Sequence, residues 1–305
     1  RGLGDVYKRQ PIIFVHKSNS YYLHAALLKA HMTNPTHDII LIGDETNDRY
    51  SFVKHYNISD YMSSANKFAK IYIHHSPNPY NFELFCFQRW FVIKDFIEKY
   101  YKGSDFFYCD TDTLLFIDIK DELQKWRKYH FTICRTGTPC FTYFNSNCIN
   151  DFTSFIYERY STEDGKKMIE EYANRLIKQN RRYGISDMTA FMAYENISGI
   201  KCLHVDSIIQ GTSYGHNFQD AKDGYEMRDN HYNVIDKLSL PKCRFISTNE
   251  MIIFKGLHFQ GISKRYMPSF FPLHWRLILS FKRFIQKINY KWHRLIIKFS
   301  QKNNC

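Results

Sequence analysis

The stretch Phe106-Phe107-Tyr108-Cys109-Asp110-Thr111-Asp112-Thr113-Leu114-Leu115-Phe116 is the part of the sequence around which the fold is organised. An apolar, aromatic run ends in two carboxylates one residue apart, and a second apolar run follows at once. This pattern predicts a buried strand that brings Asp110 and Asp112 to the edge at which open α/β sheets bind ligands. Two such carboxylates are half of a site for a hard divalent cation such as Mg²⁺ or Mn²⁺. An acidic turn after a strand is the alternative interpretation.

The composition is that of a globular protein with a basic appendage. The 305 residues suffice for one large α/β domain or two small ones, and 44% of them are hydrophobic. The net charge of +12 is uneven, because eleven of the 42 Lys and Arg, but none of the 30 Asp and Glu, follow Glu250. The body is therefore nearly neutral, which argues against a nucleic-acid-binding protein. Eight cysteines without a Cys-x-x-Cys pair fit reduced, buried thiols.

The order of expected elements opens with strand 11–16, helix 21–31 and strand 38–42, which predicts a parallel sheet. The further expected elements are strands at 69–74, 106–109, 131–134, 142–144 and 251–254, helices at 82–101, 122–128, 149–160 and 166–179, a helix beginning at Asp187, and a long loop or lid at 211–230. We interpret residues 1–10 as translated adapter sequence, 11–270 as the body and 271–305 as a tail.

A second motif, His258-x-x-Gly261-x-x-Lys264, follows the last expected strand. The imidazole of His258 could complete the coordination of a cation held by Asp110 and Asp112. Gly261 would let the backbone approach a phosphate, and Lys264 would neutralise its charge. Together the two motifs indicate a site for a metal ion and a phosphate-containing ligand.

These two motifs resemble those of GT-A fold glycosyltransferases, nearest the family-eight type that includes bacterial lipopolysaccharide galactosyltransferases and glycogenin. Arg89, the segment Phe144-Asn145-Ser146 and Asp187 support the resemblance. It implies an α/β, Rossmann-like GT-A fold with a mixed, mainly parallel sheet flanked by helices. It also implies a retaining hexosyltransferase that uses Mn²⁺ or Mg²⁺ and a nucleotide-sugar donor, UDP-linked, with a glycan or lipid-linked acceptor in surface polysaccharide or lipopolysaccharide synthesis.

The resemblance also implies roles for individual residues. The metal ligands would be Asp110, Asp112 and His258. The donor would be bound by His16, Lys17, Ser18, Asn19, Arg89, Asp110, Thr111, Gly261 and Lys264. The catalytic candidates would be Asp187 and Asn145. Three departures from the family pattern leave the sugar and subfamily open: Asn147 for Gly, Met188 for Gln, and Arg265-Tyr266 for Pro-Trp. Arg89 lies in an apolar helical repeat, where a snorkelling surface arginine is the alternative interpretation. Asp187 could act as a base or as a group that positions the sugar.

The tail is predicted to be a basic amphipathic helix. Its apolar stripe is Leu277, Phe281, Phe284, Ile288, Trp292, Leu295 and Phe299, beside Arg283, Lys287, Lys291, Arg294 and Lys298. Such a helix suits an anionic bilayer surface, reached through residues 275–300, and predicts an enzyme on the cytoplasmic face of a membrane. Packing of the stripe on the body or on a partner subunit is the alternative. For the whole protein, a nucleotidyltransferase and a non-catalytic membrane-associated binding protein remain open as alternative functions.

Overall fold

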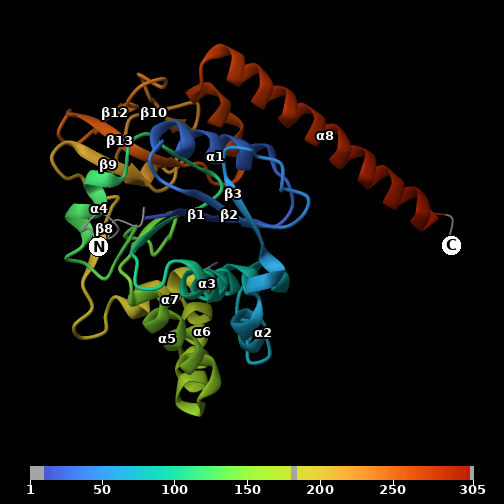
Figure 1. The fold of residues 1–305 in the computed structure, drawn as a ribbon, viewed down its shortest axis with the longest axis vertical. Helices are drawn as coiled ribbons and strands as arrows, with labels where there is room; N and C mark the ends of the chain where they lie inside the picture. Colours follow the sequence, from blue (N-terminus) through green and yellow to red (C-terminus); the bar gives the residue numbers. More distant parts are fainter. Residues whose placement is uncertain (1–9, 180–183, 303–305) are drawn as a thin grey trace, which may run out of the picture.

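The computed structural model describes residues 10–179 and 184–302, and beyond Asn289 it describes only the course of the last helix and the side chain of Trp292. Seven strands form the central sheet in the order β3-β2-β1-β4-β7-β6-β8 (Figure 1). Their bounds are β1 Ile12–Val15, β2 Ile39–Gly43, β3 Lys54–Asn57, β4 Phe106–Cys109, β6 Phe131–Ile133, β7 Phe141–Phe144 and β8 Cys202–His204. Neighbouring strands are parallel except where β7 lies antiparallel to β4 and β6. The predicted mixed, mainly parallel sheet is confirmed.

A smaller sheet is built around β13 (Met251–His258), which pairs with β5 (Thr113–Leu115), β9 (Thr212–Gly215) and β12 (Lys242–Arg244). A short hairpin of β10 (Met227–Arg228) and β11 (His231–Tyr232) is formed by the part of the chain between β9 and β12. The three residues between β4 and β5 therefore connect the large sheet to the small one. These three residues are the paired-aspartate motif.

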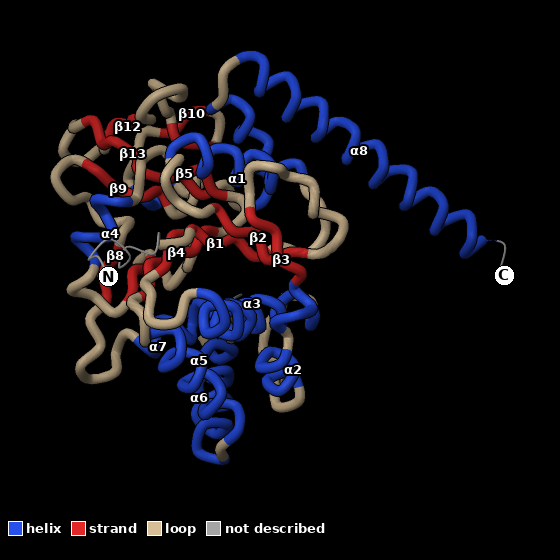
Figure 2. Tube along the Cα trace, viewed as in Figure 1, coloured by secondary structure: helices blue, strands red, loops and turns tan. Residues whose placement is uncertain are grey.

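Helices cover both faces of the central sheet (Figure 2). On one face pack η1 (Ile58–Tyr61), α2 (Ser63–Ala69), α3 (Tyr80–Tyr100), α5 (Cys148–Ser161), α6 (Glu163–Lys178) and α7 (Asp187–Tyr194). On the other face lie α1 (Tyr21–Thr33), α4 (Lys120–Trp126), the small sheet with η2 (Ala221–Asp223), and η3 (Gly261–Phe270), followed by α8 (Leu273–Lys302). The strands supply both cores by alternation, since Ile12 and Phe14 face α1 whereas Ile13 and Val15 face α3.

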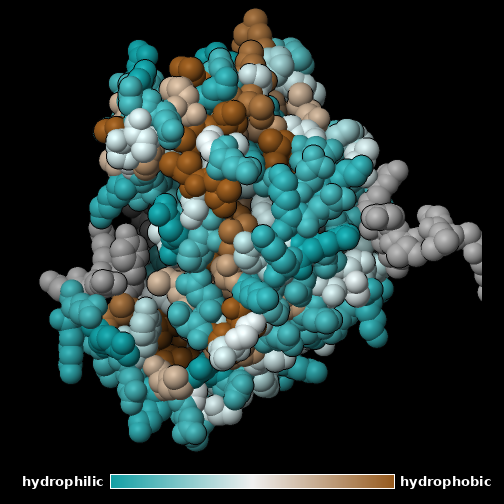
Figure 3. Space-filling view, turned by 90° about the vertical axis from the view of Figure 1, so that its left-hand side faces the viewer, coloured by the Kyte–Doolittle hydropathy of each residue, from teal (hydrophilic) through white to brown (hydrophobic). Residues whose placement is uncertain are grey.

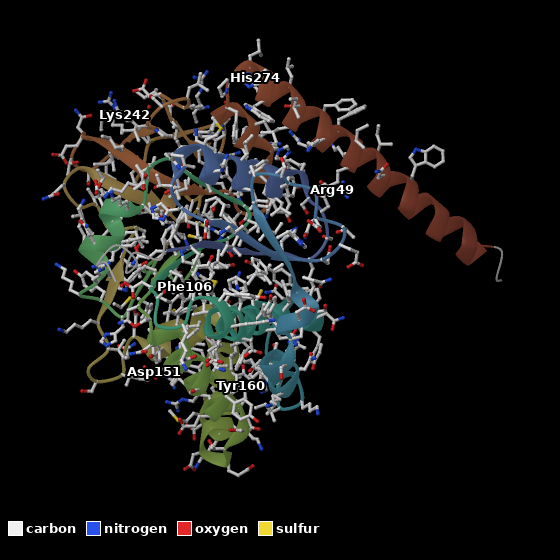
Figure 4. The ribbon with its side chains drawn as sticks, viewed as in Figure 1. Arg49, Phe106, Asp151, Tyr160, Lys242 and His274 are labelled. Carbon is white, nitrogen blue, oxygen red and sulfur yellow. The ribbon has the colours of Figure 1, made fainter. Side chains whose placement is uncertain are left out.

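The core is unusually aromatic and lies on both sides of β4. Phe106, labelled in Figure 4, is at the centre of the molecule, and its ring stacks on Phe144 of β7 with centroids 5.1 Å apart. Burial of one such side chain contributes about 1.5–3 kcal/mol. Apolar side chains also reach the surface over the small sheet, at the top of Figure 3. The exposed ones in this part of the chain are Ile208, Ile209, Ile235, Leu238, Leu240, Ile246 and Met251.

Two of the expected elements are wrong. Residues 70–74 form no strand, because Phe68 and Tyr72 pack instead into the helical layer against Phe87 of α3. The edge strand is β3, whose sequence Lys54-His-Tyr-Asn57 has no apolar run to reveal it. The expected loop at 211–230 contains β9, which pairs in parallel with β13, and β10. The last strand, expected at 251–254, continues to His258.

Two further expectations and one further finding concern the whole chain. The segment interpreted as adapter sequence lies outside the described residues except for its last member, Gln10. The seven described cysteines are free and five of them are buried, as predicted. Within the described ranges, no helix has the length and apolar character needed to cross a membrane.

Candidate active site

The pairing of β5 with β13 brings the two motifs together. In this antiparallel pair Thr113 lies opposite His258, and the backbone N–H of Phe259 donates to the carbonyl of Asp112 over 2.8 Å. As a result, Asp112 Oδ1 is 3.1 Å from His258 Nε2 and its Oδ2 is 2.7 Å from Lys264 Nζ. Residues from the two sheets thus form one cluster.

The cluster has the donor atoms of a divalent-cation site. One ligand atom from each of Asp110, Asp112 and His258 lies within 4.8 Å of the others. His258 Nδ1 is 2.7 Å from the carbonyl oxygen of His216, which accepts its hydrogen and directs Nε2 towards the carboxylates. Two carboxylates and one imidazole fit Mn²⁺ or Mg²⁺, the ions predicted from the sequence.

Charge pairing dominates the ionisation of this cluster. Burial alone would raise the pKa of Asp112, but His258 and Lys264 outweigh it and lower the pKa well below its usual range. Burial would likewise lower the pKa of His258 and of Lys264, and the Asp112 carboxylate outweighs it and raises both. Asp112 is therefore held ionised, the form in which a carboxylate binds a metal or an ammonium group.

Arg89 is a bridge between two carboxylates and not a snorkelling surface residue. Its guanidinium donates to Asp110 Oδ1 over 2.7 Å and to Asp187 Oδ2 over 2.5 Å. Tyr108 donates its hydroxyl to the same Asp110 oxygen over 2.6 Å, and Trp90 Nε1 donates to Asp187 over 3.0 Å. The side chain of Arg89 is only 13% exposed, so the pair of charge-assisted bonds is largely shielded from water. The interpretation of Arg89 as snorkelling is wrong.

Asp187 reaches this bridge because α7 begins at it. Ser186 and Thr189 form a capping box at this helix end. Just before it, the N–H of Ile185 donates to the carbonyl of His75 over 2.8 Å, which fixes the entry of the chain. Asp187 is 3% exposed.

The first loop, which the resemblance predicts to bind the donor through His16, Lys17, Ser18 and Asn19, lies beside the aspartates. His16 Nδ1 is 3.0 Å from Thr111 Oγ1, and burial lowers the pKa of His16 to about 4, so its ring is neutral at neutral pH. Asn19 accepts a hydrogen bond from Tyr50 over 2.9 Å. Lys17 extends over the ring of Phe85 in α3, 4.6 Å from its centroid.

Two residues that hold this loop were not found from the sequence. Asn47 donates to the carbonyls of His16 and Ser18 over 3.0 and 2.8 Å, and Asp44 Oδ2 accepts from the N–H of Ser18 over 2.5 Å. Ser18 has a φ of 69°, a left-handed conformation that these bonds support. The signal available in the sequence was their position after β2, since parallel neighbouring strands end at the same edge.

Of the other predicted site residues, Gly261 begins the segment that carries Lys264, and Asn145, among the described residues, does not bond to the acidic cluster. Gly261 has a φ of +55° at the start of η3, which presents Lys264 to the cluster. Asn145 Oδ1 accepts from the N–H of Cys148 over 3.0 Å at the start of α5, and among the described residues it makes no hydrogen bond to Arg89 or Asp187. The structure thus gives Asn145 a helix-capping contact in place of a contact to the acidic cluster.

Glu83 and Cys86, one turn apart on α3, were also missed. Each offers a ligand-type atom within 4.8 Å of the Asp187 carboxylate. Glu83 accepts from Ser76 and Asn78, both over 2.8 Å, and so ties the preceding loop to α3. The wall of the site beyond Asp187 is therefore a thiol and a second carboxylate.

No family model matches the chain, and no curated protein matches it. Among solved structures it is similar to mouse xyloside xylosyltransferase 1 (9% identity, 61% of this chain and 81% of that one, TM-score 0.44). It is also similar to the galactosyltransferase LgtC with donor and acceptor sugar analogues (14% identity, 88% of this chain and 99% of that one, TM-score 0.46). A third similar structure is the bifunctional glycosyltransferase WbbM (10% identity, 92% of this chain and 53% of that one, TM-score 0.47). All three are glycosyltransferases, and the likeness lies in the fold. The function proposed below rests on the side chains of this chain.

Proposed function

We propose that this protein is a metal-dependent glycosyltransferase that moves a hexose from a UDP-linked sugar to a glycan or lipid-linked acceptor. One observation carries the proposal: two motifs far apart in the sequence meet in one largely buried cluster of two carboxylates, an imidazole and an ammonium group. Asp110, Asp112 and His258 would hold Mn²⁺ or Mg²⁺. A bound cation would supply positive charge against a diphosphate.

The side chains around the cluster suit the departure of a nucleoside diphosphate from a sugar. Lys264 would release Asp112 when the cation binds and stabilise the negative charge that develops on the leaving phosphate. Neutral His16 and the loop fixed by Asn47 would bind the nucleoside. Asp187 Oδ2 is already engaged by Arg89 and Trp90, so Asp187 is better suited to accepting a hydrogen bond from a donor-sugar hydroxyl than to acting as a base. This favours a retaining reaction, in which no strong base is required.

Ligand-dependent stabilisation tests the donor class. We expect UDP to raise the melting temperature with Mn²⁺ present, because a ligand at 100 times its Kd stabilises the folded state by about 2.7 kcal/mol. Lys264→Ala should lose most of this shift, whereas Lys167→Ala, on the exposed side of α6, should keep it. Equal shifts with EDTA and with Mn²⁺, or an undiminished shift in Lys264→Ala, would contradict the assignment. A shift with nucleoside triphosphates alone would favour a nucleotidyltransferase.

The C-terminal helix supports a second part of the proposal, attachment to an anionic membrane. Of the five described side chains of the stripe, Leu277, Phe281, Phe284 and Trp292 are 58–64% exposed and Ile288 is half-buried, so most of the stripe does not pack on the body. The helix projects from the body as an arm in Figure 1 and carries no acidic residue. Each Lys or Arg near such a surface adds about 1 kcal/mol of attraction, and the cytoplasmic leaflet holds the anionic lipids. We propose that the enzyme acts on that leaflet, close to a lipid-linked or surface-polysaccharide acceptor.

Co-sedimentation with vesicles tests this attachment. The wild-type protein should bind vesicles containing phosphatidylglycerol at low salt, bind them less at high salt, and bind phosphatidylcholine vesicles weakly. The double variant Phe281→Ser/Phe284→Ser should lose binding, while Phe82→Ser, an equally exposed phenylalanine on α3, should retain it. Equal binding by all three proteins would rule out the stripe. Loss of a dimer in the double variant, without any vesicle binding by the wild type, would show that a second copy covers the stripe instead.

A further inference from the structure

The face of α8 opposite the apolar stripe is packed against the body. Trp275, Leu279, Lys282 and Gln286 recur at steps of three or four residues and lie about 150° around the helix from the stripe. Leu279 is fully buried, Trp275 packs edge-on against His24 of α1, and Lys282 Nζ lies 2.7 Å from His24 Nδ1. His274, labelled in Figure 4, marks the start of the helix. One face of α8 therefore packs against α1.

Gln286 provides the cap that the N-terminus of α1 otherwise lacks. Ser20 is the N-cap residue, yet its side chain makes no capping hydrogen bond. Gln286 Oε1 instead accepts from the N–H of Tyr21 over 3.0 Å, one of the donors that a helix leaves unsatisfied at its start. Ser20 Oγ is 3.3 Å from His16 Nε2, and the other ring nitrogen of His16 meets Thr111 between the two aspartates. The cap from α8 thus lies two side chains away from the metal motif.

Arg283 links α8 to the opposite wall of the same site. Its guanidinium donates to the carbonyl of Arg265 over 3.4 Å, next to Lys264 in η3. Lys264 Nζ also lies 5.1 Å from the ring centroid of Tyr22, at the start of α1. One turn of α8 therefore contacts both the segment that carries the nucleoside-binding loop and the segment that carries the phosphate-binding lysine.

We propose that Gln286 and Arg283 are positioning residues that hold the two walls of the donor site together. The inference rests on the proposed function for its consequence, since the gap between these walls is where the nucleoside diphosphate would bind. Gln286 and Arg283 bond to the backbone of Tyr21 and Arg265, which are not among the predicted donor-binding residues. Their effect comes through the α1 N-terminus and the Lys264 segment, so it should appear in donor binding more than in the chemical step.

Steady-state kinetics of the full-length protein test the role of Gln286. Gln286→Ala should raise the donor KM about tenfold, the effect expected from losing one helix cap, with kcat within about twofold. Gln286→Glu keeps an acceptor for the Tyr21 N–H and should restore KM. Asn289→Ala, an exposed amide on the same helix, is the matched control and should leave KM unchanged. A wild-type KM in Gln286→Ala would overturn the inference.

Hydrogen exchange supplies a readout that needs no donor. The amides of Tyr21 and Tyr22 should exchange faster in Gln286→Ala than in the wild type and in Asn289→Ala, because the helix start is no longer capped. Unchanged exchange at both amides would overturn the inference whether or not any nucleotide-sugar is turned over. Faster exchange in a protein that turns over no donor would support the bracing of α1 and contradict the proposed function.

Discussion

Arg89 is the residue that most determines the shape of the candidate site, because it joins Asp110 on β4 to Asp187 on α7. Removing it would leave two largely buried carboxylates, 16% and 4% exposed, without this counter-charge. We expect Arg89→Met to lower the free energy of unfolding by about 3–5 kcal/mol, as found when one partner of a buried ion pair is removed. Arg49→Met, at an exposed arginine labelled in Figure 4, should change it by less than about 0.5 kcal/mol. Denaturant unfolding measures both, and equal values would contradict the bridging role.

His24, on the face of α1 that packs against α8, should make the free energy of unfolding depend on pH. Burial, with a smaller contribution from Lys282, lowers its pKa to about 4, whereas an unfolded histidine has a pKa near 6.5. Between these values the unfolded chain binds more protons than the folded one, so the contribution of His24 is full above pH 6.5 and is lost as the pH falls towards 4. The loss should be on the order of 1 kcal/mol after allowing for partial burial. Unfolding at pH 7 and pH 4.5 should show a smaller pH effect in His24→Gln than in the wild type; an equal effect would contradict this account.

At the scale of single elements, the loop after β1 depends on a glycine in β2. A Cβ at Gly43 would stand 2.1 Å from Asn47 Oδ1, so the side chain that holds this loop would be displaced. Gly43→Ala should therefore raise the Kd for UDP and Mn²⁺ severalfold, measured by calorimetry, as two hydrogen bonds to the loop weaken. Gly103→Ala is the control: its Cβ meets nothing within 4 Å, and its φ of +75° makes it cost stability without affecting binding. Equal Kd values in both variants would show that the loop is not held in this way.

The elements also show what could be predicted from the sequence. Strands β1, β2 and β4 were predicted because each is an uninterrupted apolar run, the pattern of a strand buried on both faces. Edge strand β3 and the small-sheet strand β9 were missed, because partly polar strands are defined by their partners and not by their own residues. The contacts of Asn47, Gln286 and Arg89 follow from tertiary packing, which residue spacing along one element does not contain.

At the scale of the whole molecule, the candidate site exists because two sheets are joined at the Asp110-Thr111-Asp112 turn. The sequence indicated that His258 and Lys264 could complete a metal and phosphate site, and the pairing of β13 with β5 provides the contact. On the far side of α1, α8 adds a face packed on the body and a face exposed to its surroundings. In the two proposals, the exposed face of α8 would bind a membrane surface, and its packed face would hold the walls of the donor site.

Release of nucleoside diphosphate from a panel of nucleotide-sugars is the most direct test of the central claim. With Mn²⁺ and the wild-type protein, we predict turnover of a UDP-sugar, by transfer or by slow hydrolysis when no acceptor is added. Asp112→Asn, which keeps the size of the side chain but removes the charge that faces His258 and Lys264, should lower the rate by about 10²–10³-fold. Excess EDTA should do the same to the wild type. Undiminished turnover by Asp112→Asn or in EDTA would contradict the account.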